Sequence, residues 1–228
     1  MTHHPNGSLA PIALFTFKKL EPLKQTVVAL KANYLAPKSD LIIFSDGASK
    51  KTDIDAVTKV RQYLKTVSGF KSVTLKEAEN NKGLATSIIN GVSELLEQHE
   101  FIIVLEDDLV TSQNFLNYMN AALRFYQDFP NVFSIAGYTP PILAPTDYDY
   151  DTYFTRRASS WGWATWRKPW AEVDWKVAGY PHFKINFRAQ KRFNQMGSDM
   201  SRMLRKQMAG HSDSWAIRWC FHQFQHNL

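Results

Sequence analysis

The sequence has almost no cysteine and no long hydrophobic run. Cys220 is the single cysteine among 228 residues, which excludes a disulfide framework and a thiolate metal site and favours a reducing compartment. No window approaches the roughly 18 apolar residues of a membrane-spanning helix, and the amino terminus lacks the apolar stretch of a signal peptide. We therefore expect a cytoplasmic protein, and we leave open a peripheral contact at the inner face of the membrane.

Two phosphate-binding motifs are also missing. Neither GxxxxGK[ST] nor GxGxxG occurs, which argues against a P-loop or a dinucleotide site. The 27 Lys and Arg residues outnumber the 21 Asp and Glu residues, and a net charge of +6 favours anionic partners. Only Lys184–Arg205 is dense enough to form a basic patch, which suits either a membrane or acceptor-phosphate contact or a solvated helix face.

Apolar runs typical of strands alternate with segments of helical spacing over the first 136 residues. Strands are expected at Pro11–Phe17, Asp40–Ser45, Ser72–Leu75, Phe101–Leu105 and Val132–Ala136. Helices are expected at Glu21–Asn33, Thr52–Thr66, Leu84–Gln98 and Gln113–Asp128. This alternation predicts an α/β fold with a mostly parallel sheet flanked by helices.

The pattern changes after Gly137. Prolines and a run of Asp and Tyr come first, followed by a further expected strand at Thr152–Thr155 and by five tryptophans within Ser159–Trp175. A basic segment and a last helix from Ser214 complete the chain. We expect residues 1–137 and 138–228 to form two parts of one domain. Because the sequence ends inside the last helix, a truncated C-terminus is left open.

Three carboxylates follow the most apolar strand. Glu106, Asp107 and Asp108 come directly after Phe101–Leu105, which has the composition of a strand buried on both faces. Adjacent carboxylates repel one another and lose solvation unless a cation lies among them. Ligands of open α/β sheets bind at this end of the strands. A divalent metal shared with substrate phosphates would fit, and a solvated acidic turn is the alternative.

Two further segments are expected at the same edge of the sheet. Asp46 ends the Asp40–Ser45 strand, where its carboxylate is suited to accept from the imide N–H of a uracil or to form an ordinary Asp-Gly turn. Asn80–Gly83 precede a helix, where backbone amides and a flexible glycine suit a nucleotide, although ordinary loops have the same composition.

The second part of the chain offers sugar-binding and catalytic candidates. Trp161, Gly162 and Trp163 present indole rings on which a sugar can stack, or they fill a Trp-rich core. Asp213 precedes the last helix and is either a general base or a helix N-cap.

Five segments together resemble a glycosyltransferase of the GT-A fold, and more particularly bacterial glycosyltransferases similar to N-acetylglucosaminyltransferase I. They are PIALFTFKK, IIFSDGAS, NNKGLA, VLEDDLVTSQNFL and SSWGWATW, and the resemblance resumes at Asp213. The resemblance implies a Rossmann-like sheet with a nucleotide-sugar-binding half at residues 1–137. It also implies a Trp-rich, acceptor-binding lobe that carries the catalytic base at residues 138–228.

The resemblance also implies roles for individual residues. Asp46 would contact the uracil of a UDP-sugar, Asp107 would bind ribose or sugar hydroxyls, and Asp108 would ligate Mn²⁺ or Mg²⁺ that bridges the diphosphate. The rest of the donor pocket would comprise Lys19, Asn81, Lys82 and Gly83. The acceptor or sugar would meet Glu106, Trp161, Gly162 and Trp163, and the base would be Asp213. The chain departs from the family in having Lys19 in place of the usual Arg.

The implied activity is metal-dependent transfer of a hexosyl or N-acetylhexosaminyl group, with inversion, in bacterial polysaccharide biosynthesis. The partners would be a nucleotide-diphosphate sugar and a glycan or lipid-linked acceptor, with no nucleic acid, and the oligomeric state is left open. One alternative is an inactive sugar-nucleotide or glycan-binding module. The other is a sugar-1-phosphate nucleotidylyltransferase, which would carry a Gly-rich, Arg-containing loop where this chain has Thr16–Lys19.

Overall fold

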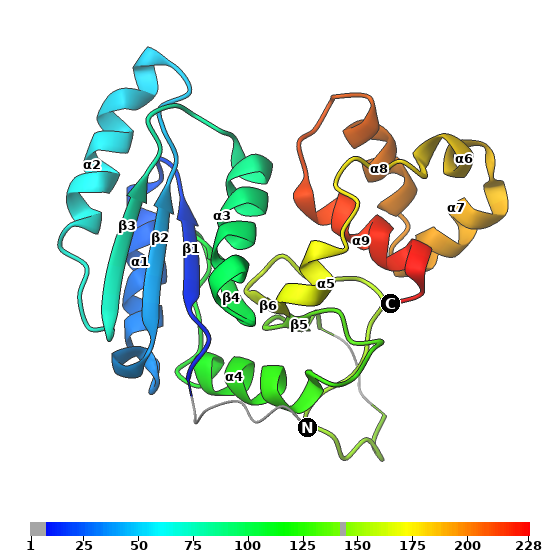
Figure 1. Cartoon of the computed structure of the whole chain (residues 1–228), viewed down its shortest axis with the longest axis horizontal. Helices are drawn as coiled ribbons and strands as arrows, with labels where there is room; N and C mark the ends of the chain where they lie inside the picture. Colours follow the sequence, from blue (N-terminus) through cyan, green and yellow to red (C-terminus); the bar gives the residue numbers. More distant parts are fainter. Residues whose placement is uncertain (1–7, 142–144) are drawn as a thin grey trace.

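The computed structural model describes residues 8–141 and 145–228, and one six-stranded sheet organises them (Figure 1). Its strands are β1 (Ile12–Thr16), β2 (Asp40–Ser45), β3 (Ser72–Glu77), β4 (Phe101–Glu106), β5 (Ile135–Ala136) and β6 (Trp163–Trp166). The spatial order is β3-β2-β1-β4-β6-β5. The first four strands are parallel, β6 runs antiparallel to β4, and β5 runs antiparallel to β6. The expected α/β fold with a mostly parallel sheet is confirmed.

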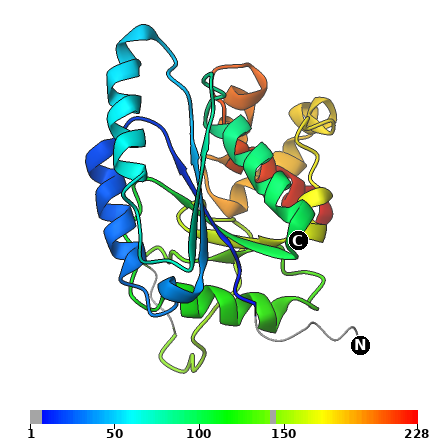
Figure 2. The same ribbon diagram turned by 60° about the vertical axis from the view of Figure 1, so that its left-hand side comes forward.

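Helices cover both faces of the sheet because each strand alternates its apolar side chains between them. Ile12 and Leu14 of β1 contribute to one core, together with helices α1 (Leu20–Lys31), α2 (Ile54–Leu64) and α4 (Phe115–Tyr126). Ala13 and Phe15 contribute to the opposite core with α3 (Leu84–Gln98). Figure 2 shows α1 and α2 on one side of the sheet and α3 on the other. Short 3₁₀ turns lie at Ala36–Lys38, Lys51–Asp53 and Asn194–Met196.

The C-terminal part adds helices to the α3 side of the sheet. They are α5 (Arg167–Ala171), α6 (Tyr180–Ile185), α7 (Phe187–Phe193), α8 (Met200–Met208) and α9 (Trp215–His226). Helix α9 contributes to two cores, since Trp215 and Trp219 belong to the core of the sheet. Ile217, Cys220 and Phe221 belong to a separate core with α6, α7 and α8. The last helix thus links the sheet to the outer helices.

Three sequence expectations differ from the structure. Thr152–Thr155 is irregular and not a strand, and the strand expected at Val132–Ala136 is reduced to Ile135–Ala136. β6 was not expected, because its four residues, Trp-Ala-Thr-Trp, lack the length from which a strand is recognised. It forms because it pairs with β4, and this pairing between residues about sixty positions apart in the chain is not visible in a local pattern. No helix of residues 8–141 and 145–228 is long and apolar enough to cross a membrane.

Candidate active site

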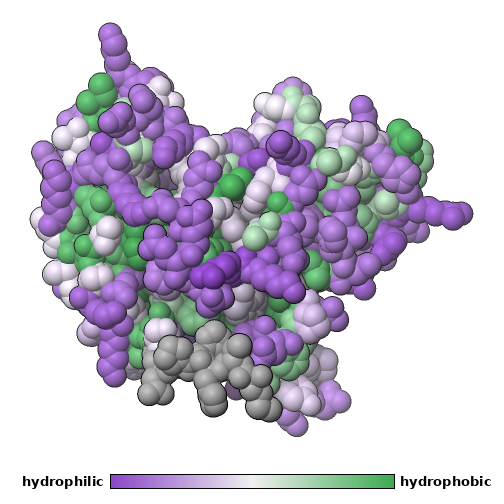
Figure 3. All heavy atoms as spheres, in the orientation of Figure 1, coloured by the Kyte–Doolittle hydropathy of each residue, from purple (hydrophilic) through white to green (hydrophobic). Residues whose placement is uncertain are grey.

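The carboxyl ends of β1, β2 and β4 bring the acidic residues to one edge of the sheet. The register pairs Thr16 with Ser45 and Phe15 with Glu106, so the three strands end side by side. Asp46 follows β2 directly, and Asp107 follows β4. The space-filling view shows a notch at the top of the molecule between the N-terminal half and the C-terminal helices (Figure 3).

Glu106 is half-buried at the end of β4. Burial raises the pKa of its carboxyl to about 7, and the neighbouring Asp108 and Asp107 act in the same direction. Lys19 and a hydrogen bond from the indole of Trp215 act in the opposite direction. Because Trp215 begins α9, this bond connects the acidic edge of the sheet to the last helix.

Asp107 holds the end of β1. Its Oδ2 accepts from the hydroxyl of Thr16 at 2.7 Å and from the backbone N–H of Phe17 at 3.2 Å. Burial raises the pKa of this carboxyl, while the two hydrogen bonds oppose the rise. One oxygen of Asp107 is therefore engaged in supporting the turn after β1.

Asp108 is the acid of the three that borders an open cleft. Its side chain is 50% exposed, and Lys19 Nζ lies 3.3 Å from its Oδ2. The cleft measures about 600 Å³, and its lining includes Leu105, Phe115, Tyr138 and Trp161. Asp108 thus lies beside the ammonium group of Lys19 and faces the open cleft.

The carboxylate of Asp46 is buried and fully hydrogen-bonded. Its Oδ1 accepts from the N–H groups of Gly47 and Lys82, both at 2.8 Å. Its Oδ2 accepts from the amide of Asn81 and from the N–H of Gly83, both at 3.0 Å. Four bonds match the acceptor capacity of a carboxylate. A contact from Asp46 to a uracil would therefore need one of these bonds to open, and that role stays a prediction.

Gly47 allows the Asn80–Gly83 turn to lie against the end of β2. A Cβ at Gly47 would lie 2.5 Å from the carbonyl carbon of Asn80, a backbone atom that cannot move aside cheaply. Asn81 also donates from its amide to the carbonyl oxygen of Gly47 at 2.9 Å. The turn after β2 and the turn before α3 thus pack against each other and are joined by a hydrogen bond.

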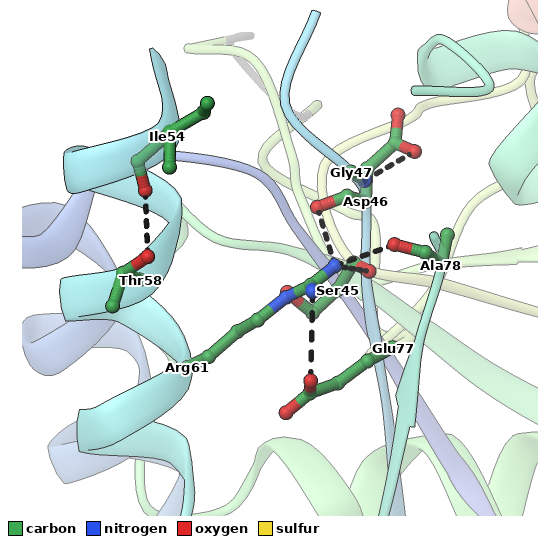
Figure 4. Close-up of polar contacts among 8 residues, drawn as sticks. All are labelled: Ser45, Asp46, Gly47, Ile54, Thr58, Arg61, Glu77 and Ala78. Carbon is green, nitrogen blue, oxygen red and sulfur yellow. Dashed lines mark hydrogen bonds and ion pairs between the residues drawn. The ribbon is translucent and has the colours of Figure 1, made fainter. Parts of the chain in front are cut away.

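Arg61 of α2 secures the same ends of β2 and β3, as Figure 4 shows. Its guanidinium donates to the carbonyl oxygens of Ala78 at 2.6 Å and Asp46 at 3.2 Å, and to the hydroxyl of Ser45 at 3.3 Å. A further Nη1 contact reaches Glu77 at 3.5 Å. Arg61 is not among the site residues expected from the sequence, because its partners become neighbours only when the sheet forms.

Asp213 lies against the Asn80–Gly83 turn. A Cβ built on Gly83 would be 3.6 Å from Asp213 Oδ2. The N-cap of α9 is Ser214, whose hydroxyl accepts from the N–H of Ile217 at 3.3 Å, so Asp213 is not the capping residue. Its Oδ1 pairs with the guanidinium of Arg218 at 3.1 Å, and its side chain is 57% exposed. The carboxylate is therefore accessible and oriented.

The two tryptophans expected to contact a sugar have different environments. Trp161 is 55% exposed, its ring lies 4.5 Å from that of Tyr138, and it borders the cleft beside Asp108. Gly162 lines the same cleft with a φ of +66°, a backbone conformation that favours glycine. Trp163 instead lies in the core at 1% exposure. Its ring is in contact range of three other indoles, those of Trp170, Trp215 and Trp219.

We expect Trp163→Ala to lower the free energy of unfolding by about 3–5 kcal/mol, the usual cost of emptying a buried aromatic site. Trp161→Ala is the matched control, because its half-exposed ring should cost no more than about 1 kcal/mol. Urea denaturation of both variants, followed by circular dichroism, gives the two values. Equal losses in the two variants would contradict the placement of Trp163 as the core residue of the pair.

The structure thus brings most of the expected site residues to one region. The carboxyl ends of β2 and β4, the Asn80–Gly83 turn and Asp213 are joined through the contacts described above. Sequence reasoning missed Thr16, Tyr138 and Trp215. Thr16 was detectable in principle, since it is the polar residue that ends an apolar strand, as Glu106 is at the end of β4. Tyr138 and Trp215 had no comparable signal.

The donor atoms at this edge fit a hard divalent cation that completes its shell from a substrate. In the described part of the chain, no three His, Cys, Asp or Glu side chains are grouped to hold a metal by themselves. Asp108 offers a half-exposed carboxylate on an open cleft. Mg²⁺ and similar ions are commonly bound by one or two carboxylates together with substrate phosphates.

Comparisons with known proteins find likeness only among solved structures. No protein-family model matches the sequence, and no curated protein matches it significantly. The mannosyltransferase PcManGT from Pyrobaculum calidifontis, in complex with GDP-Man and Mn²⁺, is 15% identical, with 72% of this chain and 48% of that chain covered and a TM-score of 0.43. S. aureus TarS is 12% identical, with 51% and 20% covered and a TM-score of 0.37. This chain spans less than half the length of either protein. Because the overlap is so partial, it supports no conclusion about the activity of this chain.

Proposed function

We propose that this chain is a metal-dependent glycosyltransferase that takes a sugar from a nucleotide-diphosphate donor, a UDP-sugar in the first instance. The observation that carries the proposal is the meeting of three features at one edge of the sheet. Asp108 presents an open carboxylate to a cleft that also exposes Trp161. The turn before α3 follows the end of β2, and the accessible acid Asp213 lies against Gly83 of that turn.

The donor would lie across the ends of β2 and β4. The Asn80–Gly83 turn stands at the N-terminus of α3, where the helix dipole favours a negatively charged group. Lys19 lies beside Asp108 with 62% of its side chain exposed and would donate to the diphosphate. A divalent cation held by Asp108 would offset the charge of the leaving diphosphate when bound.

Asp213 would act as the general base for an inverting displacement. Its carboxylate would take the proton of an acceptor hydroxyl, whose oxygen bonds to the anomeric carbon as the bond to the diphosphate oxygen breaks. Arg218 would orient the carboxylate through the 3.1 Å pair. The ring of Trp161 would offer a face to the acceptor or the transferred sugar. We propose that the acceptor is a glycan or a lipid-linked glycan.

A thermal-shift panel tests the donor site. We expect one nucleotide sugar among UDP-glucose, UDP-N-acetylglucosamine and GDP-mannose to raise the melting temperature only when Mn²⁺ is present. At a ligand concentration of 100 Kd the stabilisation should be about 2.7 kcal/mol, which is several degrees for a domain of this size. Mn²⁺ alone and each nucleotide sugar alone are the controls.

The absence of any metal-dependent shift across the panel would contradict a donor site at Asp108. A shift without release of UDP or GDP in a hydrolysis assay would instead indicate a binding module that lacks catalysis. The two outcomes separate the enzyme from the non-enzyme alternative.

A further inference from the structure

The corner between α6 and α7 exposes two large apolar side chains. Ile185 ends α6 with 73% of its surface exposed, and Phe187 begins α7 with 83% exposed, the highest value among the exposed large apolar residues described. Figure 1 places this corner at the outer edge of the C-terminal helices, away from the sheet. Single exposed apolar residues are common on protein surfaces, but two at one projecting corner are more informative.

The corner is held in shape by hydrogen bonds. The Asn186 side chain caps α7 by accepting from the N–H of Ala189 at 3.0 Å. Gln190 donates from its amide to the carbonyl oxygens of Phe183 at 3.2 Å and Lys184 at 2.9 Å. Phe183 itself is buried in the core of the outer helices. Ile185 and Phe187 therefore project because the backbone around them is fixed.

The positive charge of the chain is concentrated in the sequence segment that contains this corner. Residues 175–212 contain eight Lys and Arg residues and one acidic residue, Asp199, which gives +7. The whole chain carries +6, so the remaining residues together carry −1. All eight basic residues of the segment are exposed.

These basic side chains are not neutralised within the described structure. None of the eight forms an ion pair with a carboxylate among residues 8–141 and 145–228, and Asp199 pairs instead with Arg157 from outside the segment at 2.9 Å. The positive charge of these eight side chains is therefore available to bind an anionic partner.

We propose that the α6–α7 corner and its basic surroundings form a membrane-contact surface that binds anionic phospholipid. Exposed apolar side chains enter the interface between head groups and acyl chains, and basic residues around them bind anionic head groups. A solvated helix face would explain the charge but not the exposure of Ile185 and Phe187. A nucleic-acid-binding surface would explain the charge but not an exposed aliphatic side chain such as Ile185. The surface deepens the proposed function by placing the enzyme where lipid-linked acceptors are found.

Vesicle flotation of the full chain tests this surface. We expect the chain to float with vesicles containing about one third phosphatidylglycerol and to float at least about tenfold less with phosphatidylcholine alone, because the attraction depends on anionic lipid. Raising NaCl to about 0.5 M should weaken the binding, because salt screens exposed charges. Ile185→Asp/Phe187→Asp and Arg188→Gln/Lys191→Gln should each reduce the bound fraction about fivefold or more.

Val28→Asp is the matched control, because Val28 is 66% exposed on α1, far along the chain from the basic segment. It should bind vesicles as the unchanged chain does. All variants replace exposed side chains, so circular dichroism and melting temperature should show an intact fold.

Three results would overturn the membrane-contact surface: no flotation of the unchanged chain, equal binding to neutral vesicles, or normal binding by Ile185→Asp/Phe187→Asp. Tight binding of heparin or DNA that the basic variant loses, without vesicle binding, would identify a polyanion site instead. Vesicle binding needs no donor or acceptor, so a failure here is distinct from a failure of the proposed activity. The apolar variant should also keep its thermal shift with donor and Mn²⁺.

Discussion

Replacing Asp108 with Ala should reduce Mn²⁺-dependent release of the nucleoside diphosphate by at least about 10²–10³-fold, the usual cost of losing one group that stabilises developing charge. The physical reason is that Asp108 is the acid of the β4 terminus with both exposure and an open cleft in front of it. The fold should not change, because an exposed ion pair such as Asp108–Lys19 contributes at most about 1 kcal/mol.

Asp55→Ala provides the control for Asp108. Asp55 is also an exposed acid paired with one lysine, Lys59 at 2.7 Å, but it lies on α2. Its variant should keep full activity and the same Mn²⁺ dependence. Normal metal-dependent activity in Asp108→Ala would remove Asp108 from the metal site and the proposed mechanism with it.

Asp213→Asn should lower kcat by about 10²–10⁴-fold, the range for loss of a positioned general base. Asparagine keeps the size of the side chain and an oxygen that can still accept from Arg218, but it cannot take a proton at neutral pH. Donor binding should therefore remain, and the thermal shift with nucleotide sugar and Mn²⁺ should equal that of the unchanged chain. Donor hydrolysis, in which water replaces the acceptor, provides the rate.

The split between donor binding and turnover distinguishes a base from a merely structural acid. Asp213→Asn should lose turnover while its thermal shift with nucleotide sugar and Mn²⁺ is unchanged. Asp199→Asn is the control, since Asp199 is likewise paired with an arginine, Arg157, but stands at the start of α8 and not before α9. Wild-type turnover in Asp213→Asn would contradict its role as the base.

The central strand and its acidic end could be predicted from the sequence because the signal is local. Phe101–Leu105 is a continuous apolar run, which a buried parallel strand requires, and the change to three carboxylates marks where it ends. The expected strands at Pro11–Phe17 and Asp40–Ser45 are also largely apolar. Since parallel strands end at one edge, the proximity of Asp46 to the β4 terminus followed from topology alone.

The hydrogen bonds of Asp46 could not be predicted in the same way. The residue type and the following glycine suit a base-binding acid and a turn equally. Three of its four partners lie about 35 residues further along the chain. These partners reach the Asp46 carboxylate only in the folded chain. The sequence therefore predicted the position of Asp46 but not its hydrogen bonds.

Trp161 and Trp163 show a second limit. Residues two apart in a regular strand point to the same side, which made one shared role natural. Gly162 breaks the regularity with its positive φ, and β6 begins only at Trp163. One ring therefore lies on the cleft and the other in the core, although only Gly162 separates them in the sequence.

The double attachment of α9 has a consequence for which positions of the chain can change at little cost. Asp213 lies two residues before a twelve-residue helix that is fixed to the sheet on one side and to the outer helices on the other. A rigid helix transmits displacement along its whole length, so repacking among α6, α7 and α8 would shift Asp213 as well as the surface that those helices expose. Substitutions are thus least costly at solvent-facing positions of the outer helices, and most costly at the side chains that pack with Ile217, Cys220 and Phe221.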